Sequence, residues 1–184
     1  MKSILISIQP KWCELIASGK KTIEVRKTRP KIETPFKVYI YQTKNEAGLK
    51  HFDQHSNKLN DFLIIRKCGT VIGEFICDEV YIRPANTLYY GKGKEDYLDL
   101  IKSACMTEMQ VLDYMGGKFN RDTYFWHISD LKIYDKPKEL DMFRKPCSFS
   151  CKEYGNGKGD CSTCGELNII TRAPQSWCYV EELQ

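Results

Sequence analysis

Short runs of β-branched and aromatic residues, separated by glycine, proline and polar stretches, constrain the fold of this chain more than any other feature. Such runs are typical of strands. They lie at residues 3–8, 22–26, 36–43, 61–82, 124–134 and 175–183. Helical spacing is confined to three segments, which begin at Pro10, Tyr97 and Thr107. Many short strands with few helices predict an α+β fold built round a curved sheet or small β-barrel.

The composition favours a folded protein that lies outside membranes. The hydrophobic content of 42% and the aromatic content of 12% are those of a globular chain. A length of 184 residues suits one domain, so we expect residues 1–184 to form a single domain. No run approaches the roughly 18 apolar residues of a membrane helix, and the N-terminus does not resemble a signal peptide. An odd count of nine cysteines then favours a reducing, cytoplasmic location.

The stretch GKKTIEVRK, residues 19–27, joins a glycine turn to an alternating strand. In a strand, Ile23 and Val25 share one face, while Glu24 and Arg26 share the other and lie about 6–7 Å apart. On spacing alone, this pattern is most often a solvent-exposed strand whose Glu–Arg pair contributes about 0–1 kcal/mol. The alternative is a charged site, because six basic residues crowd into positions 20–31 against one acid.

Four segments of the chain resemble the ASCH family, named for its homology to activating signal cointegrator. SIQPKWCELIASGKKTIEVR resembles the family's strand, helix and G-x-K-x-x-E-x-R motif, and VIGEFICDEV resembles its next strand. YFWHISDLKIYDKPKEL and RAPQSWCYVEEL resemble the closing strands of members common in prophages. The resemblance covers most of the chain outside residues 44–60 and 144–165. It implies a PUA-like small curved β-barrel with flanking helices, and a cleft where the charged turn meets the sheet.

The resemblance also implies a connection with RNA. Some members look like RNA-binding modules, at least one is a ribonuclease, and a bacterial subgroup hydrolyses N4-acetylcytidine. In that subgroup a lysine, a threonine and a glutamate carry the chemistry. The lysine aligns with Lys21 and the glutamate with Glu74. The threonine aligns with Glu24, so this sequence departs from the amidohydrolase pattern.

We therefore predict binding of RNA or a nucleotide-like ligand in a cleft lined by Lys21, Glu24, Arg26 and Glu74. The alternative is a hydrolase, either a ribonuclease or an N4-acetylcytidine-type amidohydrolase. In that case Lys21 is a proton shuttle or nucleophile, and Glu24 or Glu74 is the general base. An ordinary salt bridge between lysine and glutamate is the simpler explanation of the same residues.

Further residues extend the predicted ligand site. Lys27 and Arg29 suit backbone phosphates, although a solvated basic face is an equal alternative. Tyr41 is the aromatic residue that we expect to stack on a base, with core packing as the alternative. His127 is expected to be a hydrogen-bonded strand histidine and not a catalytic one.

A cysteine-rich insertion at about residues 144–165 predicts a zinc site. Cys147, Cys151, Cys161 and Cys164 have the spacing C-x3-C-x9-C-x2-C. Two close pairs of thiolates suit tetrahedral zinc, and four of them saturate the metal, so a structural site is expected. Free thiols or two disulfides are the alternatives. A third possible function is that of an adaptor, in which this cysteine-rich knuckle contacts a protein partner.

Overall fold

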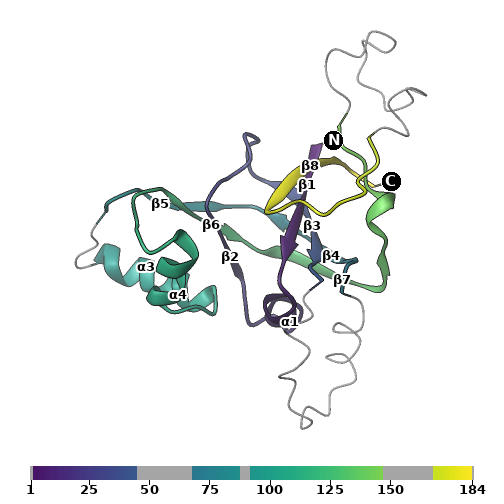
Figure 1. Ribbon diagram of the computed structural model, residues 1–184. Coiled ribbons are helices and arrows are strands. Elements are labelled where there is room, and N and C mark those ends of the chain that lie inside the picture. The colour runs from purple at the N-terminus through teal and green to yellow at the C-terminus, as the bar shows by residue number, and fades with distance from the viewer. Residues whose placement is uncertain (1, 45–67, 88–91, 147–167, 184) are drawn as a thin grey trace. The chain divides into compact units, whose positions relative to one another are not determined.

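A computed structural model describes residues 2–44, 68–87, 92–146 and 168–183. Within these residues the chain forms three α-helices and eight strands in two sheets (Figure 1). The helices are α1 (Pro10–Ala17), α3 (Lys92–Ser103) and α4 (Glu108–Met115), and a 3-10 turn, η2, covers Leu140–Met142. The strands are β1 (Lys2–Ile8), β2 (Ile23–Arg26), β3 (Phe36–Gln42), β4 (Val71–Cys77), β5 (Val80–Arg83), β6 (Thr123–His127), β7 (Ser129–Lys138) and β8 (Trp177–Glu181). The predicted α+β class is confirmed, while strand pairing among these residues gives two sheets and no closed barrel.

The chain divides into two compact units. The first contains Met1–Cys13, Lys37–Glu74 and Lys132–Gln184, and the second contains Glu14–Phe36 and Phe75–Leu131. Each unit has its own cluster of buried apolar side chains.

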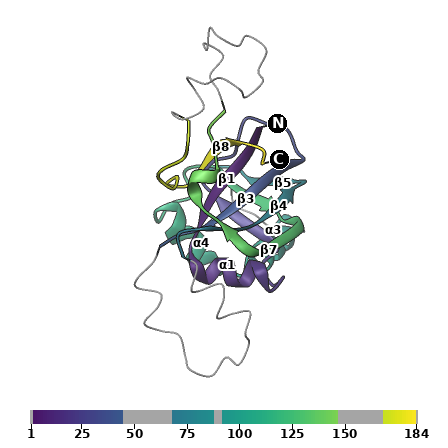
Figure 2. The ribbon, with the colours of Figure 1, turned by 90° about the vertical axis from the view of Figure 1, so that its right-hand side faces the viewer.

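The larger sheet has the strand order β7-β4-β3-β1-β8 (Figure 2). In the first unit, β1 runs parallel to β3 and antiparallel to β8, as in the pairs Ile4↔Val38 and Lys2↔Glu181. The apolar run of β1 suits a strand with neighbours on both sides, because six of its seven residues are buried. Leu5 packs with Tyr39, Phe143 and other apolar residues in the core of this unit.

The second unit consists of the antiparallel sheet β2-β6-β5 and helices α3 and α4, which pack on it. Ile23 and Val25 of β2 lie in this core with Phe125 of β6, so the predicted inward face of the alternating strand is confirmed. Helix α4 has well-defined ends. Thr107 forms a capping box with Gln110, and the left-handed Gly116 terminates the helix with a φ of 91°.

The expected single strand over residues 124–134 is in fact two strands. β6 ends at His127 and β7 begins at Ser129, because the backbone N–H of Ile128 donates to the carbonyl of Thr22 and Asp130 adopts a φ of 46°. β7 continues through Pro137 to Lys138. β7 is an edge strand, where proline's missing N–H need not interrupt a ladder of hydrogen bonds.

Candidate functional site

Three charged residues of the GKKTIEVRK stretch meet in the second unit. The Lys21 ammonium lies 3.4 Å from Oε2 of Glu24, and the Arg26 guanidinium lies 2.9 Å from Oε1 of the same carboxylate. Lys21 also donates a hydrogen bond of 2.8 Å to the backbone carbonyl of Ala104. We call Lys21, Glu24 and Arg26 the charged triad.

Local structure fixes where the triad begins. Helix α1 is followed by Gly19 with a φ of 72°, a backbone geometry that favours glycine. The N–H groups of Lys20 and Lys21 then both donate to the carbonyl of Leu15, which is a common way to close a helix end. This turn delivers Lys21 to the start of β2, so that its side chain meets Glu24 three residues later.

The charged triad is buried. Lys21 is 2% exposed, and Glu24 and Arg26 are each 6% exposed. In the antiparallel register Glu24 lies opposite Trp126, which is 0% exposed. The interpretation of β2 as a solvent-exposed strand is therefore wrong, because its polar side is covered as well as its apolar side. Two cations and one carboxylate leave the triad with one net positive charge.

A tyrosine and a lysine border the triad. Lys27 is exposed, and its ammonium lies 5.0 Å from the ring centroid of Tyr114 in the last turn of α4. Burial raises the pKa of Tyr114, while the nearby Arg26 opposes that rise. The sequence analysis missed Tyr114. The available signal was its position three residues after the core residue Val111, which places the two side chains on neighbouring parts of the helix surface.

Arg29 is half-buried and lies beyond β2. Its guanidinium donates long hydrogen bonds of 3.4 Å to the carbonyls of Pro30 and Ile32. Its charge also lowers the pKa of Tyr124 against a larger rise from burial. Arg29 therefore contributes positive charge beside the strand that pairs with β2.

Glu74 belongs to the first unit, whereas the triad belongs to the second. Its carboxylate accepts a hydrogen bond of 2.5 Å from the Tyr134 hydroxyl and lies 3.9 Å from the Lys37 ammonium. Burial and then the bond to Glu74 raise the pKa of Tyr134. Lys37 also contacts Glu182 at 2.7 Å, and this bond raises the pKa of Lys37.

The predicted aromatic residue Tyr41 is 5% exposed and packs with Leu5 and Val71 in the core of the first unit. This position suits core packing, which was the alternative to base stacking. Trp126 is also a core residue, and its ring meets that of Phe36 edge-on at 5.6 Å.

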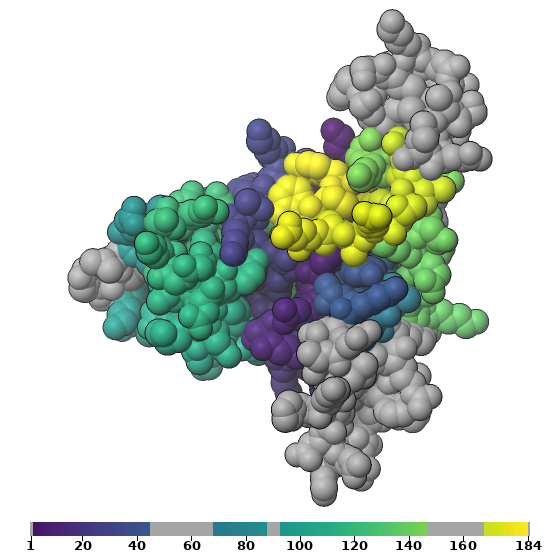
Figure 3. Space-filling view, in the orientation of Figure 1, coloured from purple at the N-terminus to yellow at the C-terminus, as the bar shows by residue number. Residues whose placement is uncertain are grey.

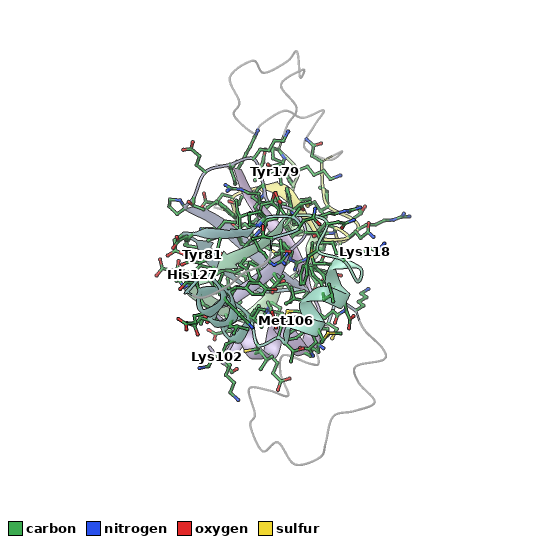
Figure 4. The ribbon with its side chains drawn as sticks, turned by 90° about the vertical axis from the view of Figure 1, so that its left-hand side faces the viewer. Tyr81, Lys102, Met106, Lys118, His127 and Tyr179 are labelled. Carbon is green, nitrogen blue, oxygen red and sulfur yellow. The ribbon has the colours of Figure 1, made fainter. Side chains whose placement is uncertain are left out.

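His127 is a hydrogen-bonded strand histidine, as expected. It is the last residue of β6, with a side chain 36% exposed, and its Nδ1 lies 2.7 Å from the Asp78 carboxylate. Burial raises the pKa of Asp78, but the hydrogen bonds to its carboxylate, led by that with His127, and the charge of His127 together outweigh burial and lower that pKa. Figure 4 shows His127 beside Tyr81, which agrees with the pairing of β5 and β6.

The predicted zinc ligands, Cys147, Cys151, Cys161 and Cys164, lie outside the described residues. Among the residues that the structure does describe, no group of three or more histidine, cysteine or acidic side chains is arranged to hold a metal ion. Within the same ranges, no helix has the length and apolar character needed to cross a membrane.

The ASCH domain family matches residues 6–91, slightly less than half of the chain, and this segment includes the triad and Glu74. The crystal structure of ASCH from Zymomonas mobilis is 20% identical, with a TM-score of 0.57 over 98% of this chain and 88% of that one. One single-substitution variant of the same protein is 21% identical, with a TM-score of 0.56 over 99% of this chain and 92% of that one. A second variant is 20% identical, with a TM-score of 0.58 over 98% of this chain and 89% of that one.

No curated protein matches the sequence. The fold defines an α+β protein of the kind seen in ASCH from Zymomonas mobilis, since identity of about one residue in five supports a statement about fold alone. More particularly, residues 6–91 match the ASCH domain, and this segment contains the charged strand β2.

Proposed function

We propose that this protein binds RNA or a nucleotide-like ligand through the charged triad and the basic residues beside it. The observation that carries the proposal is a nearly buried cluster in which two cations share one carboxylate, so that the site is positive. Electrostatic interactions are stronger away from water. A phosphate group is the common anionic feature of RNA and nucleotides, and it complements the excess positive charge.

Lys27 and Arg29 support the proposal because they continue the positive charge from the buried triad toward solvent. Lys27 is exposed at the end of β2, and Arg29 is half-buried two residues later. Together with the triad, these residues give a ligand both a positive interior group and accessible contacts for its phosphates.

The geometry of Lys21 supports binding more than catalysis. Its ammonium already contacts Glu24 and donates to the Ala104 carbonyl, so both contacts hold it in place. A nucleophilic or proton-shuttling lysine must reach the reacting atom, whereas these two acceptors hold the Lys21 side chain inside the fold. Hydrolysis of RNA or of an acylated nucleoside, with Lys21 and Glu74 in acid–base roles, is the competing proposal.

Fluorescence anisotropy with a labelled single-stranded RNA, repeated at several salt concentrations, tests the binding proposal. We expect Lys21→Met to weaken RNA binding, because it removes the excess positive charge of the buried triad. Lys136→Met is the matched control, because it removes one exposed lysine charge from β7. Equal affinity of the two variants and the wild type would reject the site. Chromatography of the same mixtures, and of mixtures with N4-acetylcytidine, detects turnover and thereby tests the hydrolase alternative.

We also propose that the four cysteines of the insertion hold one structural zinc ion. The support is their spacing as two close pairs, since nothing else in the insertion supplies a core. Metal analysis of protein purified without added zinc should find one zinc per chain, and the paired change of Cys161 and Cys164 to serine should abolish it. Folded wild-type protein without zinc would overturn this proposal. Capture of a protein partner by the wild type but not by the paired variant would support the adaptor function instead.

A further inference from the structure

The charged triad is too buried to contact a large ligand by itself. Lys21 is only 2% exposed, and the carboxylate that it shares with Arg26 is 8% exposed. A ligand that senses the triad must therefore meet residues that connect it to solvent. Two residues of the second unit satisfy this condition on the side of α4, namely Lys27, which is exposed, and Tyr114, which is half-buried.

Tyr114 contacts both cationic residues at the end of β2. Hydrogen bonding with the Arg26 side chain and the Lys27 backbone lowers the pKa of its hydroxyl against a larger rise from burial, and the Lys27 ammonium lies 5.0 Å from its ring centroid. The ring also packs against the core cluster that contains Val25 and Val111. Tyr114 is therefore held on three sides, by the core, by Arg26 and by Lys27.

These contacts determine what the Tyr114 hydroxyl can offer a ligand. A phenol oxygen accepts hydrogen bonds through its lone pairs and donates one through its proton. The Tyr114 hydroxyl therefore has a proton to donate when an incoming anion supplies an acceptor. Hydrogen bonds from cationic and N–H groups polarise the phenol and strengthen its own donation.

The position of Tyr114 is rigid enough for specific recognition. Helix α4 begins at the capping box of Thr107 and ends at the left-handed Gly116, two residues after Tyr114. The helix lies at the molecular surface, where α3 and α4 form the teal and green region of Figure 3. A donor on a well-capped helix that is packed against a sheet needs little ordering when a ligand binds.

We propose that Tyr114 and Lys27 form the entrance of the anion site and bind a phosphate group of the RNA or nucleotide. The Tyr114 hydroxyl donates to a phosphate oxygen, and the Lys27 ammonium neutralises the phosphate charge. The charged triad lies behind them and holds Tyr114 in position through Arg26. This inference rests on the proposed function, and it names the chemical group that is recognised and two residues that contact it.

The test compares variants in competition binding. A labelled single-stranded RNA of about six nucleotides is displaced by inorganic phosphate from the wild type, Tyr114→Phe and Tyr81→Phe. Tyr81→Phe is the matched control, because Tyr81 donates to Glu79 from β5, the other edge strand of the same small sheet. We expect Tyr114→Phe to weaken both RNA and phosphate binding about tenfold, and Tyr81→Phe to match the wild type.

Salt dependence separates the two entrance residues. Tyr114→Phe removes a neutral hydroxyl, so the slope of log affinity against log salt concentration should not change. Lys27→Met removes one phosphate contact, so the magnitude of that slope should fall by about one. A purely structural role of Tyr114 would weaken RNA and nucleoside binding alike, so uridine without phosphate is a further probe. Its binding should be the same in the wild type and in Tyr114→Phe.

The outcomes distinguish the inference from the function on which it rests. If the wild type binds neither RNA nor phosphate, the proposed function fails and the inference fails with it. If the wild type binds both and Tyr114→Phe binds them equally well, the inference alone is overturned. Tyr114→His retains a ring and an N–H donor, so it should recover much of the affinity lost in Tyr114→Phe. A histidine variant as weak as the phenylalanine variant would also overturn the donor role.

Discussion

Glu24 should be the residue of the charged triad whose removal destabilises the protein most. Its carboxylate contacts Lys21 at 3.4 Å and Arg26 at 2.9 Å, and all three side chains are at most 8% exposed. Glu24→Ala therefore leaves two like charges buried together. Removing one partner of a buried pair typically costs about 3–5 kcal/mol, because the remaining charge is uncompensated. We expect a loss in that range for Glu24→Ala.

Lys21→Met should be milder than Glu24→Ala. The methionine side chain has a volume close to that of lysine, and the Arg26–Glu24 pair remains intact. What is lost is the contact with Glu24 and the hydrogen bond to the Ala104 carbonyl, worth about 1–2 kcal/mol together. Glu24→Gln should fall between the two variants, because an amide oxygen still accepts a hydrogen bond from Arg26 but carries no charge.

Urea unfolding followed by circular dichroism measures these free energies of unfolding. Glu182→Gln serves as the control, because its pair with Lys37 is short at 2.7 Å but its side chain is 33% exposed. A partly exposed pair contributes about 0–1 kcal/mol. If Glu24→Ala destabilises the protein no more than Glu182→Gln does, the argument that burial makes the triad strong is refuted.

Three further predictions concern single residues outside the triad. Gly73→Ala should destabilise β4, because an added Cβ would lie 2.5 Å from a backbone carbonyl oxygen of β7. Thermal unfolding of the wild type and the variant measures the loss of stability. Burial raises the pKa of Cys77 to about 12, so iodoacetamide at pH 8 should alkylate the half-buried Cys105 and spare Cys77 in the folded protein, as mass spectrometry would reveal. The fold lowers the pKa of Asp78. The pairing of Asp78 with His127 therefore stabilises the protein above the unfolded pKa of about 3.9. This stabilisation disappears as the pH falls through the folded pKa. Asp78→Asn should remove that part of the pH dependence between pH 2 and 5, and an unchanged acid unfolding curve would contradict it.

The alternating pattern of β2 predicted which residues share a face but not what covers that face. Ile23 and Val25 are core residues as expected, and Glu24 and Arg26 form the expected pair. A two-residue period carries no information about the layer beyond the strand. The burial of Glu24 depends on Trp126, about a hundred residues away in the sequence, and on the register that places the two side by side.

The residues that sequence reasoning missed are defined by tertiary contacts. Tyr114 lies on a helix that was predicted, but only the packing of α4 brings its hydroxyl to Arg26. For His127 the hydrogen-bonded strand position was expected, but the strand break directly after it and its partner Asp78 were not. Backbone breaks of this kind depend on a hydrogen bond to Thr22, more than a hundred residues earlier.

The identity of residue 24 decides how Lys21 is used. In the amidohydrolase subgroup of the ASCH family, from whose pattern this sequence departs, a threonine aligns here, and a neutral hydroxyl places no negative charge beside the lysine. In this chain Glu24 supplies that charge and also holds Arg26, so one carboxylate orients both cations. A lysine side chain that is anchored by buried acceptors has a fixed position, whereas a lysine that attacks a substrate must reach the reacting atom. The carboxylate at position 24 is one ground for proposing recognition of a phosphate rather than covalent or acid–base use of the same lysine.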